Sequence, residues 1–98
     1  MASYVCLFDW TDQGVKNAAD SVERVESSSE MAQSKHGLPL ERIYWTVGAH
    51  DLVAVLGAPD VESVSAFLLD LAAAGNVRST TMRAFDRDAM AAILGRSV

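Results

Sequence analysis

The sequence predicts one α+β domain spanning residues 1–98, with a ferredoxin-like split β-α-β fold on an antiparallel four-stranded sheet. Three observations support this prediction. The 98 residues suit a single domain. Half of the residues are hydrophobic, which is enough for a core. The stretches follow one another as strand, helix, strand, strand, helix, strand and a short final helix, so we expect both long helices to pack on one face of the sheet.

The first predicted strand covers residues 3–10 and is apolar on both faces. Alternation places Tyr4, Cys6, Phe8 and Trp10 on one face. The other face carries Val5 and Leu7, followed by Asp9. Because neither face is polar along most of its length, we expect both faces to be covered.

A polar helix is predicted over residues 21–36. Asp20 is expected to cap it, with Glu23 in the capping-box position. Its helix propensity is low, because the serines at 27–29 offer the backbone competing hydrogen bonds. We expect it to end at Gly37 in a left-handed conformation.

Two apolar stretches, at residues 40–47 and 51–57, predict a β-hairpin closed by the short loop 48–50. This hairpin places His50 and Asp51 side by side at the edge of the sheet. It is the point of the chain where polar, chemically versatile side chains take a structurally defined position.

The second long helix is predicted between Asp60, as its N-cap, and Gly75, as its C-terminal glycine. Apolar residues recur at helical spacing along it: Val61, Val64, Phe67, Leu68 and Leu71. A fourth strand follows at residues 76–85. Asp86 is expected to cap a final helix that Gly95 ends.

Composition excludes several classes of partner. The formal net charge is −5 without a basic stripe, which argues against nucleic acid and against an anionic membrane surface. No apolar run approaches the roughly 20 residues of a membrane span. The single cysteine excludes an intramolecular disulfide, and the N-terminal residues enter a strand pattern without a charged leader and an apolar signal core. We therefore expect a cytoplasmic protein.

The face of the sheet that the helices leave open raises the question of self-association. An uncovered apolar face of this kind is rare in soluble monomers. A second copy is the simplest cover, so the sequence predicts a homodimer closed as a dimeric α+β barrel. Assembly into a higher oligomer stays open.

The chain also resembles the GYD-domain family of small, mostly uncharacterised bacterial proteins over nearly its whole length. Matching motifs lie at residues 3–5, 10–17, 20–21, 44–48, 51–53, 58–60, 75–79 and 83–85. The resemblance implies a ferredoxin-like fold of the dimeric α+β barrel type and no established reaction. One motif departs from the family, because His50 stands where the family has the tyrosine of Gly-Tyr-Asp.

A more distant resemblance is to the ligand-binding domain of Lrp/AsnC-type regulators. There too a Gly-x-x-Asp hairpin follows an apolar strand, and a Gly-x-Val segment begins the last strand. This resemblance implies small effectors bound at subunit interfaces. No helix-turn-helix precedes the domain in this chain, so only effector binding would carry over.

His50 and Asp51 are the candidate catalytic residues. A histidine with a pKa near the reference value of about 6.5 serves as a general acid or base. The alternative, which we favour, is a polar turn in which Asp51 accepts hydrogen bonds from backbone N–H groups.

Four further residues are candidates for ligand binding. Trp10, Trp45 and Tyr44 would line an apolar cavity, and Arg83 would anchor a carboxylate. The competing interpretations are ordinary core or dimer packing for the aromatic residues and an edge arginine that prevents aggregation. The expected ligand is small and apolar or aromatic.

The remaining reactive groups favour no cofactor and no metal. Cys6 has no basic neighbour in sequence, so we expect a buried structural thiol. His36, His50 and Cys6 show no ligand-like spacing. No phosphate-binding loop or nucleophile elbow is present.

Three functions are compatible with these sequence features. The first is a small-molecule binding or sensing homodimer, with a cavity between sheet and helices or at the dimer interface. The second is a cofactor-independent enzyme, similar to monooxygenases or isomerases of the same barrel type, with His50 as acid or base. The third is an interaction protein without a ligand. We rank binding first, because no pair of reactive groups is fixed by spacing.

Overall fold

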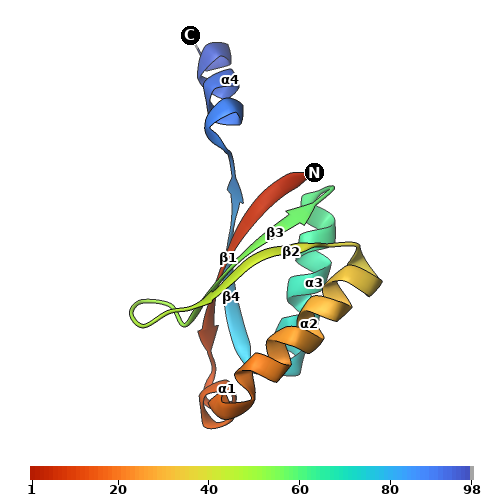
Figure 1. The fold of residues 1–98 in the computed structure, drawn as a ribbon, viewed down its shortest axis with the longest axis vertical. Coiled ribbons are helices and arrows are strands. Elements are labelled where there is room, and N and C mark those ends of the chain that lie inside the picture. Colours follow the sequence, from red (N-terminus) through yellow and green to blue (C-terminus); the bar gives the residue numbers. More distant parts are fainter. Residues whose placement is uncertain (98) are drawn as a thin grey trace.

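The computed structural model describes residues 1–97 of the chain. The elements occur in the order β1 (Ala2–Trp10), α1 (Asp12–Lys16), η1 (Ala18–Asp20), α2 (Ser21–His36), β2 (Leu40–Trp45), β3 (Leu52–Ala58), α3 (Val61–Ala74), β4 (Val77–Ala84) and α4 (Arg87–Ser97). The four strands form one antiparallel sheet in the order β2-β3-β1-β4. α2 and α3 lie together on one side of it (Figure 1). The predicted split β-α-β fold is therefore confirmed.

The two faces of the sheet differ sharply in burial. On the helix-covered face, Tyr4, Cys6 and Phe8 of β1 lie beside Ala54 and Leu56 of β3, and all are buried. The core lies between this face and the helices. The helical layer contributes Ala32 of α2, Val64 and Phe67 of α3, and Leu38 just after α2. The opposite face, which we call the open face, is covered by nothing within the described chain. The prediction that β1 is apolar on both faces holds, but only one face is buried within the chain.

Most of the predicted helix ends are confirmed. The Asp60 carboxylate accepts from the backbone N–H of Ser63 at 2.8 Å, and the Asp86 carboxylate accepts from that of Ala89 at 2.8 Å. Gly37 and Gly75 both adopt the left-handed conformation after α2 and α3. These residues end or begin helices for the reasons that their side chains predict.

The prediction that Asp20 caps α2 is wrong. Asp20 belongs to the 3₁₀ turn η1, with φ −93° and ψ 4°, and its side chain makes no capping hydrogen bond. A capping residue needs an extended backbone to turn its carboxylate onto the following N–H groups. Because η1 runs directly into α2, Asp20 has no such geometry, and the capping box with Glu23 does not form.

Two other boundaries differ from prediction. β2 ends at Trp45, and the loop of the hairpin extends from Thr46 to Asp51, where the N–H of Thr46 donates to the carbonyl of Asp51 at 2.8 Å. α4 continues through Gly95 to Ser97. Glycine in an exposed helix costs only about 1 kcal/mol relative to alanine, so it does not have to end one.

α4 stands apart from the rest of the fold. It continues beyond the end of β4 and projects away from the sheet and from α2 and α3 (Figure 1). The chain extends over 50 × 31 × 18 Å. Within residues 1–97, no helix is both long enough and apolar enough to cross a membrane.

Candidate functional site

A cavity of about 110 Å³ lies between the helix-covered face of the sheet and the two long helices. Its apolar wall comes from the sheet and from both long helices and includes Phe8, Trp10, Ile43, Leu56, Phe67 and Leu71. Its polar lining residues are Ser21, Arg24, Ser28, Ser29 and Asn76. Apolar cavities of about 150 Å³ bind benzene, so this space accepts a chemical group slightly smaller than a benzene ring.

The serine-rich middle of α2 is the local origin of this cavity. Ser28 and Ser29 line it together with the fully buried Ala32, so the side of α2 above the sheet presents small side chains. Leucine or phenylalanine at these positions would extend into the space. The serines that lower the helix propensity therefore also leave room beneath the helix.

Two tryptophans mark the cavity and its surroundings. Trp10 lines the cavity itself. Trp45 lines an adjoining open groove between α2 and β2, with Val25 and Ile43 shared between the two spaces. The indole Nε1–H of Trp45 donates to Ser21 Oγ at 2.9 Å. This hydrogen bond fixes the indole against the beginning of α2.

A network of hydrogen bonds joins the α1 segment to the loop after α3, next to the cavity-lining residues Ala74 and Asn76. The N–H of Thr11 donates to the carbonyl of Asn76 at 3.0 Å, and its hydroxyl donates to the carbonyl of Gly75. Gln13 Nε2 donates to the carbonyl of Ala74 at 3.0 Å and to Asn76 Oδ1 at 2.9 Å. Two segments far apart in sequence are thereby joined, and Asn76 is held in the cavity wall.

Gly14 makes this contact possible. A Cβ atom added at Gly14 would lie 2.0 Å from the carbonyl oxygen of Asn76. Only glycine permits this approach of two backbones. The arginine of the cavity belongs to the same region, because Arg24 Nη1 donates to the carbonyl of Asn17 at 2.6 Å and Nη2 to that of Gly14 at 3.3 Å.

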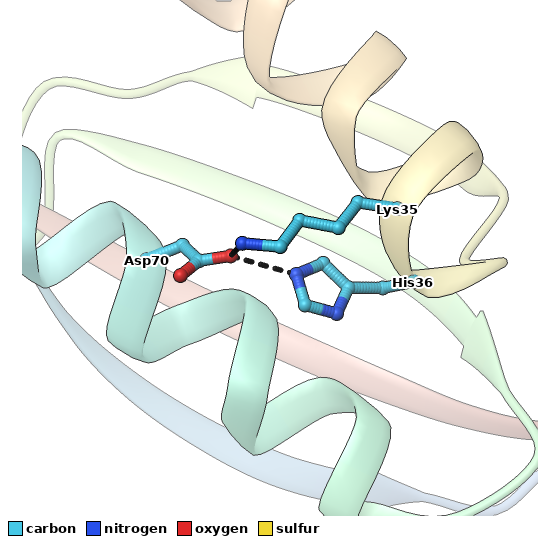
Figure 2. Close-up of polar contacts among 3 residues, drawn as sticks. All are labelled: Lys35, His36 and Asp70. Atoms are coloured by element: carbon cyan, nitrogen blue, oxygen red, sulfur yellow. Dashed lines mark hydrogen bonds and ion pairs between the residues drawn. The ribbon is translucent and has the colours of Figure 1, made fainter.

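The C-terminal end of α2 is joined to α3 by two polar contacts with Asp70. Figure 2 shows Lys35 and His36, at the end of α2, converging on Asp70 of α3. Lys35 Nζ and His36 Nε2 each lie 2.8 Å from Asp70 Oδ2. These two hydrogen bonds hold the pKa of the Asp70 carboxyl below its usual value. The His36 ring also meets Phe67 edge-on, with centroids 6.0 Å apart.

The hairpin brings His50 and Asp51 to the end of β1, away from the cavity lining. His50 Nδ1 lies 3.0 Å from Asp9 Oδ1. Asp51 Oδ2 accepts from the backbone N–H of Trp10 at 2.9 Å. The Thr46 hydroxyl donates to the carbonyl of His50. Asp51 therefore caps the end of a strand, while His50 forms a histidine–carboxylate pair with about a third of its side chain exposed.

Tyr44 and Arg83 lie outside the cavity lining. Tyr44 is on the open face and is 56% exposed. Arg83 lies near the end of β4, with its guanidinium 4.5 Å from the centre of the Phe85 ring and 5.7 Å from that of Tyr4. It also donates to the carbonyl of Ser3 at 3.2 Å. In this chain Arg83 contacts aromatic rings and backbone.

Cys6 is fully buried, and burial raises the pKa of its thiol, which makes it unreactive. Among residues 1–97, no three histidine, cysteine or acidic side chains gather as a metal ion requires.

Sequence reasoning missed the polar part of the cavity and the clamp between the helices. For Ser28, Ser29 and Arg24 the sequence predicted only that they lie in a helix of low propensity. Pairing of Lys35 and His36 with Asp70 depends on how two helices far apart in the chain are placed. The one signal in the sequence was the run of small residues on a helix that had to cover a sheet.

Comparison with known proteins agrees with this geometry. The family model of the GYD domain matches residues 4–94. A protein of Thermus thermophilus named "Glutamine synthetase and cystathionine beta-lyase binding protein" is 27% identical over 84 residues, which cover 86% of this chain and 88% of that protein.

Solved structures show the same fold. The chain superposes on the Lrp/AsnC-like regulators MtbAldR, with a TM-score of 0.68 at 14% identity over 88% of this chain, and FFRP-DM1, with 0.61 at 15% over 87%. It spans about half of MtbAldR, 52%, and all of FFRP-DM1. TTHA0845 from Thermus thermophilus gives 0.54 at 25% identity, covering 88% of this chain and 95% of that one. Together these solved structures show that the chain has a ferredoxin-like fold.

Proposed function

Because this chain belongs to the GYD domain family, we propose that it is a homodimeric module that binds or senses a small molecule. The observation that carries the proposal is the cavity of about 110 Å³ beneath the serine-rich face of α2. A protein interior is normally packed without such space. An apolar cavity between sheet and helices that is partly open to the outside therefore supports a binding role.

The shape and lining of the cavity limit the ligand. Its wall is mainly aliphatic and aromatic, so the ligand carries a short aliphatic group or a small ring. Ser28, Ser29 and Asn76 offer neutral hydrogen-bonding groups. Arg24 already donates to two carbonyls. These groups favour a mostly apolar ligand with one polar end.

The homodimer is supported by the open face. Val5 and Leu7 of β1 lie beside Val53 and Val55 of β3 there, and Met82 of β4 is 47% exposed. Such a face is self-complementary when two copies meet about a two-fold axis. Packing of two sheets face to face then buries these side chains. We place this dimer in the cytoplasm, in keeping with the single buried thiol.

Two matched variants test the ligand site. Ser28→Leu places a branched side chain in the cavity, whereas Ser27→Leu makes the same change on the exposed side of the same helix. Thermal unfolding is measured with a panel of short aliphatic and monocyclic aromatic compounds. We expect at least one compound to raise the Tm of the wild type and of Ser27→Leu but not of Ser28→Leu.

Native mass spectrometry of protein purified gently from cells complements this test. A dimer carrying a reproducible extra mass, lost in Ser28→Leu, supports the proposal and identifies the ligand. Equal ligand effects in both variants would place the binding site elsewhere. A monomer without stabilising compounds would contradict both parts of the proposal.

A second candidate function rests on His50. Its pairing with Asp9 leaves Nε2 as the free ring nitrogen and fixes the ring orientation, as an acid or base catalyst requires. In this case the protein would be a cofactor-independent enzyme. His50→Ala would then abolish turnover while the Tm changes little, and Asp9→Asn would shift its pH profile.

The named relative suggests protein partners as well. The Thermus thermophilus protein is called a binding protein of two enzymes. We infer a corresponding role for this chain as a partner of metabolic enzymes. Light scattering with purified glutamine synthetase and cystathionine beta-lyase tests it, and the absence of complexes with both at micromolar concentrations would contradict it.

A further inference from the structure

α4 and the two residues before it form an arm whose large apolar side chains are mostly exposed to solvent. Met90 is 41% exposed and Leu94 54%, and Phe85, at the base of the arm, is 47% exposed. Met90, Ile93 and Leu94 lie at helical spacing on one side of α4. Polar and small side chains occupy the other side, including Asp88, Ala92 and Arg96.

An isolated helix of this length is marginal in water. Helices shorter than about 12–15 residues need tertiary packing for most of their stability, and α4 has 11 residues. It nevertheless extends from the sheet without packing on α2 or α3 (Figure 1). The apolar side of α4 therefore lacks the contact that would stabilise it.

The accessible surface area of the chain is larger than that of a typical monomer of its mass, by about the area that one partner buries in an interface. The chain exposes 6319 Å², whereas a folded monomer of 10.5 kDa exposes about 5,400 Å². The excess of about 900 Å² is close to the roughly 800 Å² that each partner buries in a standard interface. The radius of gyration agrees, at 14.5 Å against about 12.6 Å for a compact domain of this length.

We propose that α4 is an arm that reaches across the edge of the sheet and packs its apolar side against a second copy of this chain. This inference rests on the proposed homodimer and extends it. The arm follows β4 directly, and β4 is an edge strand whose Met82 lies on the open face. A second copy on that face consequently lies beside the base of the arm.

The arm is also long enough. Eleven helical residues span about 16 Å, and two sheets packed face to face are about 10 Å apart. Phe85 and Asp86 lie between β4 and α4 and belong to neither element, so the direction of the helix can change there.

Charge favours a second copy over a membrane. From Phe85 to Ser97 the arm contains two arginines and two aspartates, so its formal charge is zero. Helices that bind anionic membranes are rich in lysine and arginine on their polar side. The neutral arm adds nothing to the repulsion between two copies that each carry a net charge of −5.

Photo-cross-linking in the full-length chain tests this proposal. Leu94→p-benzoylphenylalanine is introduced into ¹⁵N-labelled protein, which is mixed with unlabelled wild type. Ala92→p-benzoylphenylalanine, on the opposite side of the helix, is the matched control. Cross-linked peptides joining labelled and unlabelled chains, at least fivefold more abundant from position 94 than from 92, are the expected result.

Self-association is measured in parallel. We expect Leu94→Glu to weaken the dimer at least tenfold, and Ala92→Glu to change it less than twofold. Cross-links only within one chain, or a wild-type dimer without cross-links from position 94, would overturn the arm and leave the dimer intact. A wild-type monomer at millimolar concentration would overturn the arm and the homodimer together, while the Ser28→Leu test of ligand binding stands separately.

Discussion

The two faces of the sheet both carry apolar residues along β1 and β3 but have different surroundings. Cys6 and Leu56 on the covered face are 0% and 2% exposed, whereas Tyr44 and Met82 on the open face are 56% and 47% exposed. On β1, successive residues alternate between the two environments. The comparison shows that hydrophobicity alone does not define the core of this chain, because the helices decide which apolar face becomes core and which is left for a partner.

Removal of a leucine from each face tests this difference most strongly. Leu56→Ala opens a cavity on the covered face and should lower the free energy of unfolding by about 3 kcal/mol. Leu7→Ala, the matched change on the open face, should cost roughly 1 kcal/mol at low protein concentration. Urea unfolding measures both. The cost of Leu7→Ala should rise with concentration, since a partner covers Leu7 only in the dimer, and equal costs at low concentration would contradict the assignment of the faces.

The next largest effect is expected at the close contact between Gly14 of α1 and the backbone of Asn76. Gly14→Ala places a methyl group against the carbonyl of Asn76, at a distance that no Cβ contact tolerates. The segments must separate, and we expect a loss of about 2–3 kcal/mol. Gly95→Ala is the control, because nothing lies within 4 Å of its added Cβ, and it should stabilise α4 by up to about 1 kcal/mol. Thermal unfolding distinguishes the two, and an unchanged Tm for Gly14→Ala would contradict the described contact.

A charge on the open face tests the proposed dimer. Val53→Lys places an ammonium group in the middle of that face, where a partner would have to desolvate it. We expect the dissociation constant of the dimer to rise at least about tenfold, which corresponds to about 1.4 kcal/mol. Val61→Lys introduces the same charge at an exposed position of α3 and should leave the dimer intact. Analytical ultracentrifugation measures both, and equal effects would place the interface elsewhere.

The smallest effect is expected for the contacts of Lys35 and His36 with Asp70, which join α2 to α3. The pKa of Asp70 is lowered by its bonds to Lys35 and His36, so the ionised carboxylate stabilises the fold at pH values above the ordinary pKa of about 3.9. This stabilisation is lost as the pH falls below that value and through the lowered pKa of the folded state. Asp70→Asn should therefore lower the Tm at pH 7 and have little effect near pH 2.

Asp88→Asn provides the control for this pH dependence. Asp88 lies on α4 and takes part in no ion pair within the described part of the chain. Its replacement should change the Tm equally little at both pH values. A difference between wild type and Asp70→Asn that stays constant from pH 7 to pH 2 would show that the carboxylate charge contributes nothing.

The elements were predictable where local chemistry defines them. Asp60 and Asp86 cap their helices because the carboxylate of the residue just before a helix reaches the free N–H groups of the first turn. The prediction for Asp20 was wrong because Asp20 itself belongs to the 3₁₀ turn η1, and its backbone is therefore not extended. Trp10 could be predicted in the cavity wall, since it shares a strand face with Phe8. Arg83 lies on the same face but at the far end of the sheet, where strand register, which the sequence leaves undefined, places it opposite Tyr4.

The sequence by itself determined the order of the elements, the alternation along β1 and the family, because these depend on periodicity, capping and short motifs that act over a few residues. Only the tertiary structure decided that Gly14 meets Asn76, that Asp70 joins two helices, that the small residues of α2 leave a cavity and that α4 packs on neither α2 nor α3. Each of these results from the distance between segments far apart in the chain, and close packing, which no local pattern encodes, sets that distance.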